Sequence, residues 1–144
     1  MKGAVVSESL RAEESEGDQA TGTLARGVSA AIGAWVVPGF GHLMLRRWTS
    51  AAVYFVCVGG LAFTGLFMRG AVFGPGAPDM FDRLGFFADI GAGGFYFLAQ
   101  LFHGIVPDIA HASGDYGTRM FATAGILNLL TVLEAFEIGS GRRT

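Results

Sequence analysis

The chain has 144 residues, of which 51% are hydrophobic and 15% charged, and its formal net charge is −2. This length suits one domain, and the composition is more apolar than that of an ordinary soluble domain, so it indicates an integral membrane protein. Without a dense cluster of Lys or Arg, the sequence excludes the electrostatic surface that a nucleic acid partner requires.

Residues 1–23 are acidic and poor in large apolar side chains. Such a segment cannot bury enough surface to order itself, so we expect a disordered acidic N-terminal tail. The start of the chain has neither a compact basic region nor an apolar core, so no cleaved secretory signal is predicted. Residues 24–144 are predicted to form a single helical transmembrane domain.

The first predicted span covers residues 27–45, and at about 1.5 Å per residue it just reaches across a hydrocarbon core of roughly 30 Å. Pro38 lies inside it, followed by Gly39 and Gly41. Proline removes a backbone donor and glycine lowers helical propensity, so the helix is predicted to break at Pro38. A re-entrant segment that does not cross is the alternative interpretation.

The second predicted span, residues 49–68, has no charge, and Gly59 and Gly60 offer a smooth face for helix packing. Only Arg46-Arg47-Trp48 separates it from the first span, which favours a tight hairpin between two antiparallel neighbours. Cys57, the single cysteine, is expected to be a buried and inert thiol.

A loop rich in proline and glycine precedes the third predicted span, residues 84–106, which ends at Pro107. Gly94 is interpreted as a packing position there, and Gln100 as a side chain that hydrogen-bonds between helices. The fourth span covers residues 120–138. Its small and polar residues recur every three or four positions, so one stripe is expected to face protein: Ala124, Asn128, Thr131 and Ala135.

The predicted fold is therefore an all-α integral membrane domain of four transmembrane helices arranged as two helical hairpins. Seven basic residues then fall on the side of the termini and three on the other, which favours both termini in the cytoplasm. With a re-entrant first segment the spans would number three, and the termini would separate.

His42 follows the predicted break and is the first candidate functional residue. Pro38, Gly39 and Gly41 would leave backbone carbonyls free beside it, and together these groups could line an ion path or hold a proton. The simpler interpretation, which we favour, is that His42 caps the helix or hydrogen-bonds across the hairpin.

Two further groups of ionisable residues have structural explanations. Asp89, Glu134 and Glu137 lie near span ends, where pairing with arginine is expected: Arg83, Arg142 or Arg143. Imidazoles and carboxylates gather around the third loop, but their spacing matches no established metal motif, and Asp favours turns in any case: His103, Asp108, His111 and Asp115. No metal site or cofactor is predicted.

The sequence contains no Ser-His-Asp arrangement, no Gly-x-Ser-x-Gly, no phosphate-binding loop and no Cys-based metal signature, so no catalytic set and no enzyme activity are predicted. We expect a small membrane protein that acts as a subunit or assembly partner of a membrane complex, or as a homo-oligomer. An ion or small-solute transporter component that uses the broken first helix and His42 is the alternative.

The stretch Pro38-Gly39-Phe40-Gly41-His42 resembles a group of small uncharacterised bacterial membrane proteins, and more remotely the two-transmembrane-helix domain family. The closing run of residues 123–130, with Glu134-Ala135-Phe136, is similar to the C-terminal end of the same group. The remoter family carries a Tyr-Leu-Gly step after its histidine, where this chain has Leu43-Met44-Leu45. The resemblance implies a multi-pass protein of the bacterial inner membrane, and no chemistry.

Overall fold

The computed structural model describes residues 2–76, 79–101, 107 and 110–143, with the backbone alone for residues 2–10 and 12–14. Six helices and no strand are present among these residues, which confirms the predicted all-α class. In chain order the helices are α1 (Lys2–Val36), α2 (Phe40–Met44), α3 (Trp48–Phe67), α4 (Met80–Gly91), α5 (Gly94–Leu101) and α6 (Ala112–Gly139).

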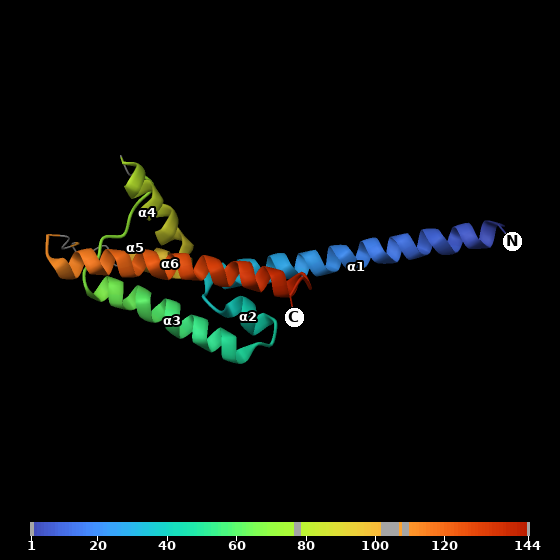
Figure 1. Ribbon diagram of the computed structural model, residues 1–144, viewed down its shortest axis with the longest axis horizontal. Coiled ribbons are helices and arrows are strands. Elements are labelled where there is room, and N and C mark those ends of the chain that lie inside the picture. The colour runs from blue at the N-terminus through green and yellow to red at the C-terminus, as the bar shows by residue number, and fades with distance from the viewer. Residues whose placement is uncertain (1, 77–78, 102–106, 108–109, 144) are drawn as a thin grey trace.

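Helices α3 and α6 form the central pair of the molecule (Figure 1). They approach closely because glycines face each other across the contact. A Cβ atom placed on Gly65 would lie 2.7 Å from the Gly117 carbonyl oxygen and 3.1 Å from the Phe121 Cβ. Phe121 itself is fully buried and fills the core between α3, α4 and α5. Small residues thus allow the tight backbone contact that helices in a bilayer use for packing.

Two of the described helices, α3 and α6, are long and apolar enough to cross a membrane. The pair α4 and α5 makes a third if it is one bent span. The second predicted span, residues 49–68, coincides with α3, and the fourth, residues 120–138, lies within α6. Large apolar side chains cover the outer faces of both helices, as lipid contact requires: Phe55, Val56 and Phe63 on α3, and Ile126, Leu130 and Leu133 on α6. Two or three helices, rather than the four that the sequence predicts, are therefore suited to cross a membrane.

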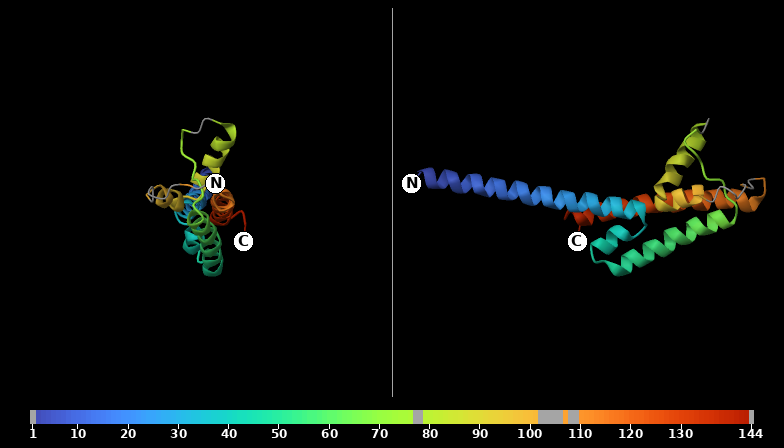
Figure 2. Two further views of the ribbon diagram at one scale, coloured as in Figure 1. Left: turned by 90° about the vertical axis from the view of Figure 1, so that its left-hand side faces the viewer. Right: turned by 180° about the vertical axis from the view of Figure 1, so that it is seen from behind.

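The first predicted span, residues 27–45, is not one crossing helix. The predicted break at Pro38 is present, because α1 ends at Val36 and α2 begins at Phe40, with Gly39 at a φ of 84°. After this turn α2 folds back along α1, and a Cβ on Gly41 would overlap the Ala30 carbonyl oxygen. Both ends of the α1–α2 hairpin therefore lie at the end of the bundle that carries the C-terminus (Figure 2).

This hairpin also changes which helices are neighbours. The sequence predicts that the first and second spans pack side by side, but α1 packs mainly on α6, and α2 lies between α1 and α3. Close contact between Gly27 of α1 and Gly139 of α6 fixes this arrangement at the C-terminal end. The fold-back replaces the predicted antiparallel pair because the chain reverses direction at Pro38 and Gly39 instead of merely kinking.

The third predicted span, residues 84–106, is also interrupted. Helices α4 and α5 meet at an angle of 108°, with the break at Ala92 and Gly93. Gly93 has a φ of 60°, in the left-handed region that favours glycine. Helix α4 rises away from the central pair as a result (Figure 1). The part of the prediction beyond Leu101 falls mostly outside the described residues.

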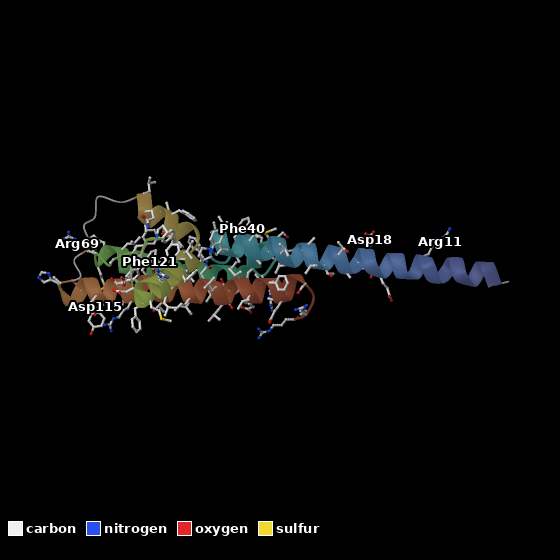
Figure 3. All side chains as sticks on the ribbon, turned by 90° about the horizontal axis from the view of Figure 1, so that it is seen from above. Arg11, Asp18, Phe40, Arg69, Asp115 and Phe121 are labelled. Atoms are coloured by element: carbon white, nitrogen blue, oxygen red, sulfur yellow. The ribbon has the colours of Figure 1, made fainter. Side chains whose placement is uncertain are left out.

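Helix α1 extends well beyond the rest of the molecule at its N-terminal end. Figure 3 shows Arg11 and Asp18 on this projecting part, far from Arg69 and Asp115 at the other end of the bundle. Residues 15–26 are exposed. The segment for which the sequence predicts a disordered tail thus continues α1 as a helix, held by backbone hydrogen bonds rather than by a buried apolar face.

Candidate functional site

His42 is fully buried at the place where three helices meet. Its position on α2 depends on the turn at Gly39, where a Cβ would overlap the Ala51 carbonyl oxygen, and on Gly41, where a Cβ would press on Ala34 and Ala135. Only glycine permits such close approach at both positions. The residues that the sequence singles out therefore form the elbow that carries His42 into the bundle.

The imidazole of His42 faces a carboxylate from α6 and a hydroxyl from α3. Its Nε2 lies 3.6 Å from Glu134 Oε2, and the Tyr54 hydroxyl donates a hydrogen bond to the same oxygen. The Tyr54 ring lies 4.7 Å from the His42 ring between centroids. We call these three residues, His42, Tyr54 and Glu134, the His42 cluster.

The His42 cluster has the composition of a site that holds or passes a proton. Neither ring nitrogen of His42 has a hydrogen-bond partner, although buried polar groups nearly always have one. The Glu134 side chain is 27% exposed, so the buried imidazole faces a carboxylate that reaches the surface. The predicted cap or cross-hairpin hydrogen bond of His42 is not among the described contacts.

A second polar group lies where the two helix breaks meet. Asn128, near the middle of α6, donates from Nδ2 to the carbonyl oxygens of Gly91 at 2.9 Å and Trp35 at 3.3 Å. Trp35 in turn donates from Nε1 to the Ile90 carbonyl oxygen at 3.1 Å. Gly93 packs so tightly that a Cβ there would overlap the Trp35 carbonyl oxygen. We call this contact of Trp35, Ile90, Gly91, Gly93 and Asn128 the joint.

The predicted stripe on α6 faces protein, as expected, because Ala124, Asn128, Thr131 and Ala135 are all buried. The predicted packing residues elsewhere divide into two groups. Gly59 and Gly94 have close neighbours, with Phe95 above Gly59 and the Val36 carbonyl oxygen against Gly94. Gly60 has open space around its Cα, and no hydrogen bond joins the half-buried Gln100 to another described residue.

The residues considered for a metal do not assemble in the described part of the chain. His111 is exposed at the N-cap of α6, and Asp115 forms an ion pair with Arg119 at 2.8 Å. His103 and Asp108 lie outside the described residues. Within the described ranges, no group of three His, Cys, Asp or Glu side chains could hold a metal ion.

Only one of the three predicted carboxylate pairs with arginine is present. Glu137 lies 3.8 Å from Arg143, as expected. Glu134 instead belongs to the His42 cluster. Asp89 is fully buried, accepts a hydrogen bond from the Phe73 backbone N–H at 2.8 Å, and has no partner for Oδ1. Cys57, expected to be buried, is exposed.

Sequence reasoning did not identify Tyr54 or Asp89 as site residues. Tyr54 carries a hydroxyl in a span without charges, but nothing in the spacing along the chain pairs it with Glu134, eighty residues later. Asp89 lies two residues before the Gly91-Ala92-Gly93-Gly94 run, and this proximity of an acid to a glycine run was the available signal.

Comparison with known families identifies a family for this chain but no activity. A model described as a family of unknown function, DUF6677, matches residues 29–144, so the chain belongs to that family. No curated protein and no solved structure matches it. The expected membership of an uncharacterised family is thereby supported, and the whole acidic tail lies outside the matched region.

Proposed function

We propose that this protein is a non-catalytic integral membrane protein that acts as a subunit or assembly partner of a membrane complex, or of its own homo-oligomer. One observation carries this proposal. A stripe of mostly small residues runs at intervals of four along the exposed face of α3, which we call the α3 stripe: Ala52, Val56, Gly60 and Thr64.

The α3 stripe has the pattern that membrane helices use to pack against one another. All four residues are exposed, and a Cβ added to Gly60 would have no atom within 4 Å. Small side chains at intervals of four let two backbones approach closely, which favours association in lipid. The packing function predicted for Gly60 is therefore assigned to a contact outside this chain.

We place the protein in the bacterial inner membrane with both termini in the cytoplasm. Helices α3 and α6 cross, while the α1–α2 hairpin and the α4–α5 bend enter from opposite sides and meet at the joint. The end that carries the C-terminus is basic: Arg26, Arg46, Arg47, Arg142 and Arg143. Arg69, Arg83 and Arg119 belong to the other side, and this excess favours the basic end in the cytoplasm.

Oxidative cross-linking of the native Cys57 tests the proposal. Cys57 is exposed one residue after Val56, so two copies that pack through the α3 stripe bring their thiols together. In native membranes we expect a disulfide-linked dimer, or a stoichiometric partner that copurifies in mild detergent. Gly60→Leu should reduce either product, whereas Ile126→Leu, on the exposed face of α6, should not.

A monomer that copurifies with nothing, forms no cross-link and is unaffected by Gly60→Leu would contradict the proposal. Because a Cβ on Gly60 would meet no described side chain within 4 Å, the leucine variant should fold normally, and its circular dichroism spectrum checks this.

A component of a path for ions or small solutes is the second candidate. The buried imidazole of His42 favours it, because neither ring nitrogen has a hydrogen-bond partner although Nε2 faces Glu134. A membrane protein gains little from a buried histidine without a hydrogen bond unless the histidine exchanges a proton or contacts a passing ion. Proton uptake into proteoliposomes that is lost in His42→Gln and retained in Tyr116→Phe would support this candidate. Equal uptake in both variants would rule it out.

A further inference from the structure

Asp89 is a buried carboxylate with unsatisfied hydrogen-bonding capacity. It lies in the last turn of α4, none of its surface is exposed, and it accepts one hydrogen bond, from the Phe73 backbone N–H to Oδ2. Oδ1 has no partner. An ionised carboxylate only accepts hydrogen bonds, and its two oxygens can accept several. One hydrogen bond therefore leaves most of its acceptor positions without a donor.

No ion pair offsets a charge on Asp89 among the described residues. The described ion pairs involve Glu134, Asp115 and Glu137 instead. The titratable groups on the surrounding elements include Asp82 and Arg83 on α4, Tyr96 on α5 and Arg69 at the start of the 69–76 segment. The face of α6 against α4 contributes Gly125 and Leu129. Burying a lone carboxylate costs several kcal/mol, so the group is stable there only when its charge is neutralised.

Phe73 is the residue through which Asp89 connects to α5. The Tyr96 hydroxyl donates to the Phe73 carbonyl oxygen at 3.4 Å, so the Phe73 residue connects this hydroxyl and the Asp89 carboxylate. Carboxylate, carbonyl and hydroxyl oxygens are the ligands of hard cations. A single carboxylate balances one positive charge, and divalent ions in proteins usually take more acidic ligands than this place offers.

We propose that Asp89 is the binding site of a monovalent cation, either a proton or Na⁺, on its unsatisfied Oδ1. The site lies three residues before the α4–α5 break, and Gly93 of that break packs on Trp35 of the α1–α2 hairpin. Half-helices that end inside a membrane are where carriers hold H⁺ or Na⁺. This inference does not depend on the α3 stripe or on assembly.

The position suggests what the cation does. Release of the cation leaves a bare carboxylate in an apolar place, so the released state is stable only if α4 or the 69–76 segment moves and admits water. Binding and release of the cation at Asp89 are thereby coupled to the geometry of the α4–α5 break.

Dicyclohexylcarbodiimide, an apolar reagent that modifies protonated carboxyl groups, tests the site in the purified full-length chain. After treatment in detergent without Na⁺, we expect peptide mass mapping to find an adduct on the peptide that contains Asp89. Asp89→Asn keeps the side-chain shape and should lose this adduct. Asp82→Asn, at a half-buried acid in the first turn of the same helix, should retain it.

Added Na⁺ distinguishes the two cations. Protection of Asp89 by NaCl but not by choline chloride identifies a Na⁺ site, and equal modification in both salts identifies a proton site. Absence of an adduct on Asp89 in the folded wild-type protein, or modification of Asp82 and Asp115 to the same extent, would overturn the proposal. Mapping the wild-type chain keeps the test decisive even if Asp89→Asn fails to fold.

Discussion

Asn128 connects the two interrupted segments of the molecule through a single amide. Its Nδ2 reaches carbonyl oxygens at the ends of α1 and α4, and Thr131 Oγ1 donates to its backbone oxygen at 2.8 Å. These carbonyls are available because each helix stops there and leaves its last oxygens without an intrahelical partner. One side chain thus satisfies a backbone carbonyl at each of two helix ends.

Replacing Asn128 by leucine should lower the free energy of unfolding by about 1 to 3 kcal/mol, because two hydrogen bonds between helices are lost and two buried carbonyls remain unpaired. Unfolding in mixed micelles, followed by circular dichroism, measures the change. Thr123→Ala is the matched control, since the Thr123 hydroxyl is exposed and bonds only within α6. An Asn128→Leu variant as stable as this control would show that the joint contributes nothing.

The burial of the Asn128 side chain was predictable from the sequence, but the groups to which it donates hydrogen bonds were not. An amide on a stripe of small residues in an apolar helix has to face protein, so its burial follows from the pattern. Its acceptors exist only because α1 stops at Val36 and α4 at Gly91. The hydrogen bond between Glu134 and Tyr54 could not be predicted from the sequence for the same reason. Tyr54 comes close to Glu134 only after α2 has folded back.

Tyr54 and Glu134 should be energetically coupled. Removing the Tyr54 hydroxyl leaves a partly buried carboxylate with one fewer donor, so Tyr54→Phe should destabilise the protein by about 1 kcal/mol. In the Glu134→Gln background the same change should cost less, because a neutral amide needs the donor less. A double-mutant cycle on unfolding free energies measures this difference, with the exposed Tyr116→Phe as control. Additive effects would contradict the contact.

At the scale of elements, the described molecule is built from two long apolar helices, α3 and α6, and two helix pairs that turn at a break, α1–α2 and α4–α5. The break at Pro38-Gly39 was predicted because a proline inside a helix removes a backbone hydrogen bond and interrupts the helix. The break at Ala92-Gly93 was not, because glycines in an apolar segment serve equally well for packing. Gly93 resolves the ambiguity through its positive φ and its contact with Trp35, and neither is visible in composition.

Gly93→Ala should be one of the most damaging single substitutions in the chain. A methyl group at this position would overlap the Trp35 carbonyl oxygen, and a φ of 60° adds about 1 kcal/mol for any residue with a Cβ. We expect a lower yield of folded protein and a lower melting temperature in detergent. Gly74→Ala, which has open space, should behave like the wild type. Equal stability of the two variants would show that the breaks do not touch.

At the scale of the whole molecule, sequence reasoning identified the apolar segments and could not decide how many of them cross. Nineteen apolar residues have the same composition whether they run straight or fold in half, so residues 27–45 read as a span. The structure turns this segment at Pro38 and brings Arg46 to the end that carries Arg142 and Arg143. The four-span prediction separates these arginines, and the difference is open to experiment.

Labelling of single cysteines by a membrane-impermeant maleimide distinguishes the two arrangements. In a Cys57→Ser background, Arg46→Cys and Ser140→Cys should react from the same side of the membrane, and Gly74→Cys from the opposite side. The reason is that the α2–α3 turn and the end of α6 lie together, while the segment after α3 lies at the far end (Figure 1). Labelling of Gly74→Cys together with Ser140→Cys, with Arg46→Cys reacting from the opposite side, would restore the four-span arrangement in which residues 27–45 cross. Labelling of Arg46→Cys together with Ser140→Cys, opposite to Gly74→Cys, would support the arrangement in which the first segment turns back at Pro38.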